Sequence, residues 1–228
     1  MPEIMTAGSP PLPSTAYEEP FWAAGKALVA GVDEVGRGPL AGPVFAAAVI
    51  LNCAQRPPWL SELRDSKELP AKQRERLSAL IRAEAVAFGL GWSSVAEIDA
   101  HGIGAANQTA MARAIAGLGR APDHVLIDGP STIPVALPQR AIVGGDALCS
   151  SIAAASIVAK VARDAVMRAV GYLYPAYDFG RNKGYATRDH LARLAEHGPC
   201  VYHRRSWLAV SRFDRSAAAA TVTIDAAR

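Results

Sequence analysis

Four acidic residues follow short apolar segments that have the length of buried strands. They are Asp33 and Glu34 after residues 28–32, Asp128 after residues 124–127, and Asp146 after residues 141–143 and two glycines. Open α/β sheets gather functional groups at strand ends, so we expect these carboxylates to lie together. Their mutual repulsion raises their pKa values unless a cation lies between them. Mg²⁺ and Mn²⁺ prefer oxygen ligands, and such a site could activate water for phosphodiester cleavage.

Each acid also has an ordinary structural interpretation. Asp128 and Asp146 stand beside glycines, as turn aspartates do. Asp33 and Glu34 fit that interpretation less well, because an unpaired carboxylate at the end of a buried strand is costly. Neighbouring strand residues point to opposite faces, so both can reach one metal cluster only if the strand bends or ends between them. The glycines that follow allow such a bend.

The segment Gly36-Arg37-Gly38 offers a second kind of chemistry. It does not fit a dinucleotide-binding loop, because Pro39 and Pro43 interrupt the region where a helix would have to start. The chain also lacks a Walker-type G-K-S/T sequence. Two glycines expose backbone that can approach a ligand closely, and arginine is a planar cation suited to phosphate.

The remaining pattern predicts an α/β domain with a mixed five-stranded sheet flanked by helices. We expect strands at residues 28–32, 44–51, 85–93, 124–127 and 141–143. We expect helices at residues 71–84, 95–118, 151–170 and 187–197, the second of them weakened by Gly102 and Gly104. Residues 1–20 are rich in Pro, Ser and Glu and predict a disordered leader. One domain is expected at residues 21–215, followed by a flexible tail at residues 216–228.

The amino-acid composition restricts the possible binding partners only loosely. The 228 residues are 50% hydrophobic, enough for a sizeable core, and the net charge is only +3. Between Arg181 and Arg215, however, eight Lys or Arg residues stand against three Asp or Glu. This segment could form a phosphate-facing patch, and a solvated basic face is the alternative.

Cysteine usage and hydropathy bear on the compartment. Cys53, Cys149 and Cys200 are far apart and form no C-x-x-C, which argues against a disulfide framework or a zinc site. The first twenty residues lack the pattern of a signal peptide, and no apolar run approaches the roughly 18 residues of a spanning helix. We therefore expect a soluble, cytoplasmic protein without membrane association.

The string GVDEVGRGPLAGPV at residues 31–44 resembles the opening signature of ribonuclease HII. Further segments are similar to that family in the same order. They are L-R-D-S-K at residues 63–67, E-I-D at 97–99, I-D-G at 127–129, G-D at 145–146, A-A-S-I-V-A-K-V at 154–161, K-G-Y at 183–185 and H-R-R-S at 203–206. The resemblance spans about residues 28–210. Two positions depart from the pattern: Gly144 replaces a common lysine, and Gly102 a common asparagine.

The resemblance implies an RNase H-like fold with a C-terminal helical appendage at about residues 171–215. It implies four catalytic, metal-binding acids that hold Mn²⁺ or Mg²⁺ in a two-metal mechanism: Asp33, Glu34, Asp128 and Asp146. In the family, a glycine–arginine–glycine backbone and a tyrosine sense the 2′-hydroxyl at an RNA–DNA junction. Those substrate-binding roles fall on Gly36, Arg37, Gly38 and Tyr185.

The implied partners are RNA–DNA hybrids and duplex DNA that contains ribonucleotides, cut on the 5′ side of the ribonucleotide. Four basic residues are candidates for contacts with duplex phosphates, with a solvated surface charge as the alternative for each: Lys67, Lys183, Arg204 and Arg205. Asp164 is excluded from the acids, because it lies in mid-helix beside Arg163 and is interpreted as half of an exposed pair. We expect a monomer, and the tail shows no clamp-binding motif.

Two other functions remain to be weighed. A metal nuclease of the same fold that acts on longer hybrids is disfavoured by the pairing of G-R-G with K-G-Y. A catalytically silent nucleic-acid-binding protein is expected to have lost an acid, yet all four are present.

Overall fold

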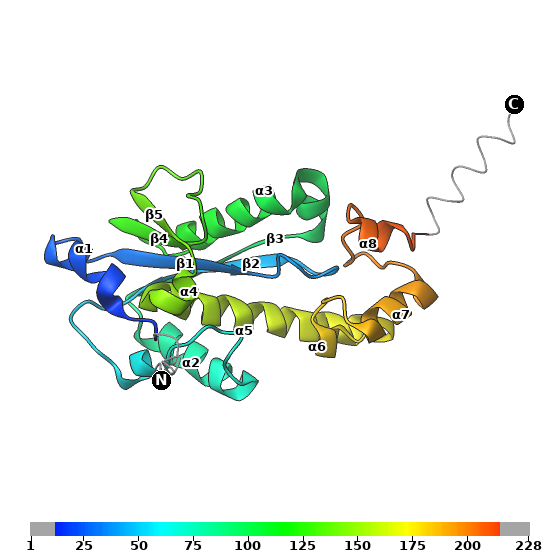
Figure 1. Cartoon of the computed structure of the whole chain (residues 1–228), viewed down its shortest axis with the longest axis horizontal. Helices are drawn as coiled ribbons and strands as arrows, with labels where there is room; N and C mark the ends of the chain where they lie inside the picture. The colour runs from blue at the N-terminus through cyan, green and yellow to red at the C-terminus, as the bar shows by residue number, and fades with distance from the viewer. Residues whose placement is uncertain (1–11, 215–228) are drawn as a thin grey trace, which may run out of the picture.

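A five-stranded mixed sheet forms the centre of the computed structural model, which describes residues 12–214 (Figure 1). Its strands are β1 (Val29–Val35), β2 (Val44–Ile50), β3 (Ala87–Ser93), β4 (His124–Asp128) and β5 (Gln139–Ile142). The spatial order is β3-β2-β1-β4-β5. The first three strands are antiparallel, whereas β1, β4 and β5 are parallel to one another. The predicted mixed five-stranded sheet is confirmed.

Helices cover both faces of the sheet (Figure 1). The helix α3 (Val95–Ala116) packs on one face, and α5 (Ser150–Leu173) with α2 (Ala71–Glu84) packs on the other. All seven residues of β2 are buried, since alternate side chains enter the two cores. This explains its uninterrupted apolar sequence, which is typical of a strand covered on both faces.

The C-terminal residues form a smaller lobe at the far end of α5 (Figure 1). It contains α6 (Phe179–Asn182), α7 (Arg188–His197) and α8 (Leu208–Ser211). Main-chain hydrogen bonds tie it to the loop at residues 36–43: Leu40 N donates to Gly184 O, Gly42 N to Tyr202 O, and Arg204 N to Leu40 O. The loop that follows β1 is therefore held between the sheet and the lobe.

Part of the expected disordered leader is folded, which corrects that prediction. Residues Thr15–Tyr17 form a 3₁₀ turn and Glu19–Ala23 form α1. Between them Glu18 is fully buried, and its carboxylate accepts hydrogen bonds from Ser151 N at 2.7 Å and Cys149 Sγ at 3.2 Å. The first residues of α5 supply no side-chain cap of their own, so Glu18 satisfies a donor at that helix N-terminus. Residues 1–11 and the expected tail at 216–228 lie outside the described residues.

Helix α3 bends where the sequence predicted weakness. Ser94 and Glu97 form a capping box at its start, while Gly102 has φ 79° and ψ 158°, a conformation outside the helical region. The glycine thus divides the helix into two stretches instead of merely lowering its stability.

In the described part of the chain, no helix has the combination of length and apolarity that a membrane span needs.

Close contact between β1 and α5 depends on Gly31. A Cβ atom at this position would overlap the main chain of Ser151 and Ile152. The same strand carries Asp33 two residues later, so the helix-to-strand distance at Gly31 helps to set the position of that carboxylate.

We predict that Gly31→Ala lowers the free energy of unfolding by about 1–3 kcal/mol, as overpacking of a core does. The matched control is Gly104→Ala in α3, where a Cβ would meet no atom within 4 Å. That substitution should raise stability by up to about 1 kcal/mol, because alanine is the better helix former. Urea denaturation of both variants measures the difference, and equal stability of Gly31→Ala and the parent chain would contradict the packing argument.

Candidate active site

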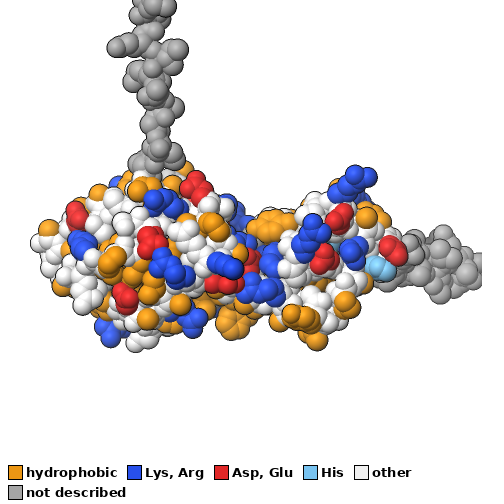
Figure 2. Space-filling view, turned by 90° about the horizontal axis from the view of Figure 1, so that it is seen from below, with side chains coloured by type: hydrophobic (Ala, Val, Ile, Leu, Met, Phe, Trp, Pro, Cys, Tyr) orange, Lys and Arg blue, Asp and Glu red, His pale blue; other side chains and the backbone are white. Residues whose placement is uncertain are grey.

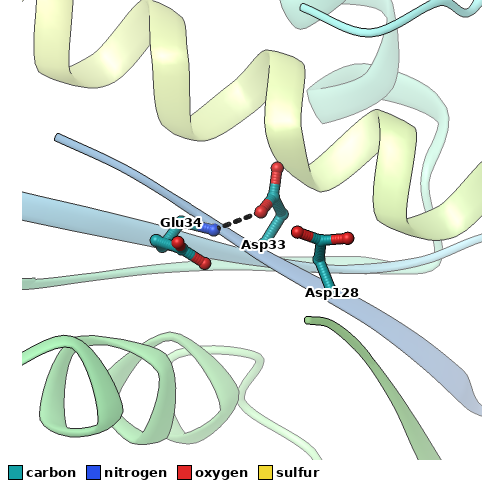
Figure 3. Close-up of side chains that lie close together, drawn as sticks. All are labelled: Asp33, Glu34 and Asp128. Carbon is teal, nitrogen blue, oxygen red and sulfur yellow. Dashed lines mark hydrogen bonds between the residues drawn. The ribbon is translucent and has the colours of Figure 1, made fainter. Parts of the chain in front are cut away.

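Three carboxylates converge where β1 and β4 run side by side (Figure 3). Asp33 and Glu34 come from β1 and Asp128 from the end of β4, and one oxygen of each lies within 4.8 Å of the others. Strand β1 continues through both acids to Val35, so it does not end between them. Asp33 and Glu34 leave it on opposite sides, and Glu34 N donates to Asp33 Oδ1 at 2.7 Å (Figure 3).

Asp146 lies in the same pocket but outside this group of three. It is carried by the short helix α4 (Gly145–Leu148), whose first residue donates its N–H to Asp128 Oδ1 at 2.7 Å. Gly144 precedes α4 with φ 67°, a left-handed conformation that glycine adopts easily. Glycine thus suits the backbone at this position, where the resemblance leads one to expect a lysine.

Burial and mutual repulsion make ionisation of the cluster unfavourable. The pKa of Asp33 is raised well above its ordinary value by burial, and then by Glu34 and Asp128. Burial also raises the pKa of Glu34, although Arg37 opposes the shift from 3.4 Å. The pKa of Asp128 is raised by burial and by Asp146. A cation among these oxygens would relieve the repulsion.

The donor set fits a hard divalent cation. Two oxygens bound to one cation at about 2.0–2.6 Å can be at most about 4–5 Å apart. The spacing within 4.8 Å among Asp33, Glu34 and Asp128 meets that limit, and all three offer carboxylate oxygens. Asp146 could join through a small movement of α4 or through a water molecule.

The acids line a pocket of about 220 Å³. Its other walls include Gly36, Arg37 and Gly38 on one side and Lys67, Lys160 and Tyr185 on the others. Figure 2 shows the larger body and the smaller C-terminal lobe, with Lys, Arg, Asp and Glu side chains gathered at the narrow part between them. Three elements predicted separately, the acids, the glycine loop and Tyr185, thus meet in one place.

Two buried arginines hold the loop that contains these glycines. Arg204 donates to the carbonyls of Gly36, Arg37 and Gly42 at 2.5–3.1 Å. Arg163 donates to Ala41, Pro43 and Lys183 at 3.0–3.1 Å. Both side chains are 0% exposed, and within residues 12–214 neither forms an ion pair with a carboxylate. Burial lowers the pKa of each guanidinium, yet arginine stays protonated at neutral pH.

Arg204 is therefore not available for a phosphate contact, which corrects its sequence-based assignment. Its guanidinium is enclosed by main-chain carbonyls that otherwise would be buried without donors. The basic string H-R-R-S gave no sign of this, because the carbonyls it serves lie more than 160 residues earlier in the chain.

The other three basic candidates differ in their surroundings. Lys67 lines the pocket, and its Nζ lies 3.6 Å from Asp65 and 3.7 Å from Asp146. The Lys183 ammonium group donates a hydrogen bond to Gly180 O, and Lys183 is not among the residues that line the pocket. Arg205 pairs with Asp214 at 2.7 Å and also donates to Pro199 O. Of these three, only Lys67 is placed for a contact beside the acids.

Asp164 is not half of an exposed surface pair, which corrects a second assignment. It is 7% exposed and pairs with Lys160 at 2.7 Å and with Arg74 at 3.9 Å, while Arg163 is fully buried. Helix α5 is covered by the sheet, by α2 and by the C-terminal lobe, so its central charged residues lie inside the protein.

Lys160 is a further pocket residue, and its sequence context alone predicted no role for it. Its ammonium lies 5.9 Å from the centre of the Tyr185 ring, and its side chain is largely buried. The available signal was helical spacing: Ser156, Lys160 and Asp164 are four residues apart and share one face of α5. Ser156 also lines the pocket.

A side chain would have different consequences at the two glycines of G-R-G. A Cβ at Gly36, where φ is 93°, would overlap the Arg163 guanidinium. A Cβ at Gly38 would meet no atom of the protein within 4 Å. The fold therefore requires glycine at position 36, whereas packing within the described protein does not require it at position 38, which lines the pocket.

Comparisons with known proteins identify relatives along nearly the whole chain. The family model described as Ribonuclease HII matches residues 30–210. The ribonuclease HII of Moorella thermoacetica is 52% identical over 194 residues, which cover 84% of this chain and 92% of that protein. The ribonuclease HII of Nitrosococcus oceani is 57% identical over 185 residues, with coverages of 81% and 90%. Among solved structures, the ribonuclease H2 from Pyrococcus horikoshii OT3 matches in fold with a TM-score of 0.71 at 24% identity, covering 82% of this chain and 97% of that one.

We predict that Asp33→Asn makes the metal-free protein more stable, because it removes a buried charge whose ionised form the fold disfavours. A gain of about 1 kcal/mol would raise the melting temperature by roughly 2–4 °C. Mn²⁺ should then stabilise the variant much less than it stabilises the parent.

Thermal unfolding with and without Mn²⁺ at neutral pH checks both effects. Asp189→Asn, at an exposed carboxylate of α7, serves as the control and should keep the full response to Mn²⁺. An Asp33→Asn variant that is less stable without metal, or that responds to Mn²⁺ as the parent does, would contradict the cation-site interpretation.

Proposed function

This chain belongs to the ribonuclease HII family, whose members are endoribonucleases of the RNase H type, and from that premise we propose a specific reaction. The chain incises duplex DNA on the 5′ side of an embedded ribonucleotide and hydrolyses the RNA strand of RNA–DNA hybrids. The observation that carries the proposal is the shared pocket. It sets a carboxylate cluster beside the bare backbone of Gly36–Gly38 and the ring of Tyr185.

The acids hold Mn²⁺ or Mg²⁺. Asp33, Glu34 and Asp128 supply the closest set of oxygens, and Asp146 completes the site from α4. When bound there, divalent cations would lower the pKa of a water molecule and neutralise charge on the leaving oxygen. The hydrogen bond from Gly145 N keeps one oxygen of Asp128 in place, and the Glu34 amide does the same for Asp33.

The reaction breaks one P–O bond. Oxygen from water bonds to the phosphorus on the 5′ side of the ribonucleotide as the bond from phosphorus to the preceding 3′-oxygen breaks. The products are a 3′-hydroxyl and a 5′-phosphate. Lys67, exposed at the rim and close to Asp146, is placed to balance charge on the phosphate, and Lys160 can do so on the side of Tyr185.

Recognition of the ribonucleotide falls to the loop and the tyrosine. A 2′-hydroxyl both donates and accepts hydrogen bonds, and it distinguishes RNA from DNA locally. Arg163 and Arg204 donate hydrogen bonds to carbonyls of the loop, and neither arginine lines the pocket. These bonds hold the loop backbone in place beside the pocket. Tyr185 is 41% exposed, and Lys160 and Arg163 lie within 5.9 Å of its ring centre, so stacking on a sugar or base would use the exposed part of the ring.

Two alternatives are less well supported. A silent nucleic-acid-binding protein has no need of three carboxylates whose pKa values are raised by burial in one pocket. A nuclease restricted to longer hybrids has no need of an open Gly38 beside a tyrosine. The cytoplasmic location and the monomeric state stay predictions from the sequence, in whose tail no clamp-binding motif is seen.

We predict a single incision 5′ of the ribonucleotide in a labelled DNA duplex that carries one ribonucleotide, with Mg²⁺ or Mn²⁺ present. An all-DNA duplex should stay intact, and Asp128→Asn should lower the rate by at least about 100-fold through loss of cation binding. Gel analysis of the products checks the cut position and both ends. Binding of the duplex without any cut in either metal would exclude the nuclease proposal.

We predict that Gly38→Ala leaves stability nearly unchanged but lowers kcat/KM on this duplex by about tenfold or more, because a methyl group would enter the space of the ligand. Gly36→Ala is the contrasting variant and should unfold at a lower temperature, since its methyl group meets Arg163. Thermal unfolding and kinetics on the same preparations separate the two effects. A fully active Gly38→Ala enzyme would show that the loop backbone does not contact the substrate closely.

A further inference from the structure

Two buried histidines face each other in the C-terminal lobe, outside the acidic site. His190 of α7 and His203 of the following loop are 0% and 1% exposed, and their Nε2 atoms lie 3.1 Å apart. The rings of Tyr177 and Phe179 pack around them. Nothing in the proposed reaction uses either histidine directly, although the second belongs to the H-R-R-S string.

Their hydrogen-bond partners determine which ring nitrogens carry protons. The Cys200 N–H donates to His203 Nδ1 at 3.0 Å, so this nitrogen must be bare and His203 carries its proton on Nε2. That proton is donated to Nε2 of His190, which must also be bare. His190 then carries its proton on Nδ1 and donates it to the main-chain oxygen of Tyr185 at 2.8 Å. One consistent set of neutral rings therefore links Cys200 to Tyr185.

Tyr185 needs such an anchor because the chain before it is irregular. Lys183 and Gly184 both have positive φ angles, 52° and 82°, and neither lies in a helix or strand. The Tyr185 amide donates to Asn182 O, and its carbonyl also accepts from Thr187 N. The histidine relay adds the one bond from a buried side chain to this carbonyl among those the structure describes.

We propose that His190 and His203 are positioning residues that hold the main chain of Tyr185 and thereby aim its ring into the pocket. The inference rests on the proposed function in one respect, namely that Tyr185 contacts the ribonucleotide. The histidines do not touch substrate. Through their hydrogen bonds they connect the turn at Cys200 to the main chain of Tyr185, the residue that contacts the substrate.

The surroundings favour neutral rings and give no support for a metal at this position. Burial, and then the neighbouring His190, lower the pKa of His203 to about 4, and burial lowers the pKa of His190. The other polar groups that face the pair are the Cys200 thiol, the Arg205 guanidinium and the Tyr185 carbonyl. In the described residues the one cluster of three metal-ligating groups is the acidic site.

The tautomers can be measured on the free protein, independently of activity. A long-range ¹H–¹⁵N spectrum at pH 7.5, with signals assigned through His190→Asn and His203→Gln, should show His203 protonated at Nε2 and His190 at Nδ1. The ¹³C shift of the Tyr185 carbonyl should change in His190→Leu and stay constant in Leu191→Ala, a control on the same helix. The opposite tautomers, a charged ring or an unmoved carbonyl shift would overturn the proposal, whatever the chain does to nucleic acid.

A double-mutant cycle tests whether the relay acts through Tyr185. On duplex DNA with one ribonucleotide, His190→Leu should lower kcat/KM by about tenfold in the parent chain and by less than about twofold in a Tyr185→Ala background. His190→Asn, which retains a donor near the Nδ1 position, should recover most of the loss, and Leu191→Ala should change kcat/KM by less than about twofold. Equal losses in both backgrounds would show a general structural role and overturn the positioning role. A parent chain that cuts nothing would count against the proposed function alone, and the spectra would still decide the relay.

Discussion

Two guanidinium groups buried against main-chain carbonyls are the interaction on which the site depends. Arg163 reaches the loop from α5 and Arg204 reaches it from the C-terminal lobe, so together they join the sheet, the long helix and the lobe. Burying two cations near each other is unfavourable, and seven hydrogen bonds to carbonyls offset that penalty. The same bonds satisfy the carbonyls of a loop that has no regular partner strand. The loop can therefore be rigid and still present bare backbone to the pocket.

The acidic cluster illustrates a conflict between stability and function in the same region. Asp33 is buried beside two other carboxylates, and Gly31 lets the strand that carries it lie in close contact with α5. Without a cation this arrangement is unfavourable, and with one it becomes a preorganised ligand set. Asp146 comes from a four-residue helix instead of a strand, and a hydrogen bond from Gly145 N to Asp128 ties that helix to the other acids.

Much of this arrangement could be predicted from sequence, for identifiable physical reasons. Apolar runs predicted the positions of the strands, and helical spacing predicted α2 with its observed bounds Ala71–Glu84. Asp128 ends β4 as expected, whereas β1 runs on through Asp33 and Glu34 to Val35 instead of ending before them. The roles of Glu18, Arg163, Arg204 and Asp164 could not be predicted in this way. Glu18, Arg163 and Arg204 bind main-chain groups far along the chain, and Asp164 is covered by elements distant in sequence. Local patterns therefore placed these buried residues in a leader or on a charged surface. Charge type alone does not reveal burial when the partners are main-chain carbonyls or a helix N-terminus.

The most direct test of this account separates the support of the loop from the binding of metal. Arg204→Lys keeps a positive charge but loses the fork that contacts Gly36, Arg37 and Gly42 together. Incision at a single embedded ribonucleotide should fall by at least about 100-fold, while Mn²⁺ affinity measured by calorimetry should stay within about twofold of the parent chain. Full incision activity in a folded Arg204→Lys protein would contradict the account, because the loop would then read the ribonucleotide without its buried support.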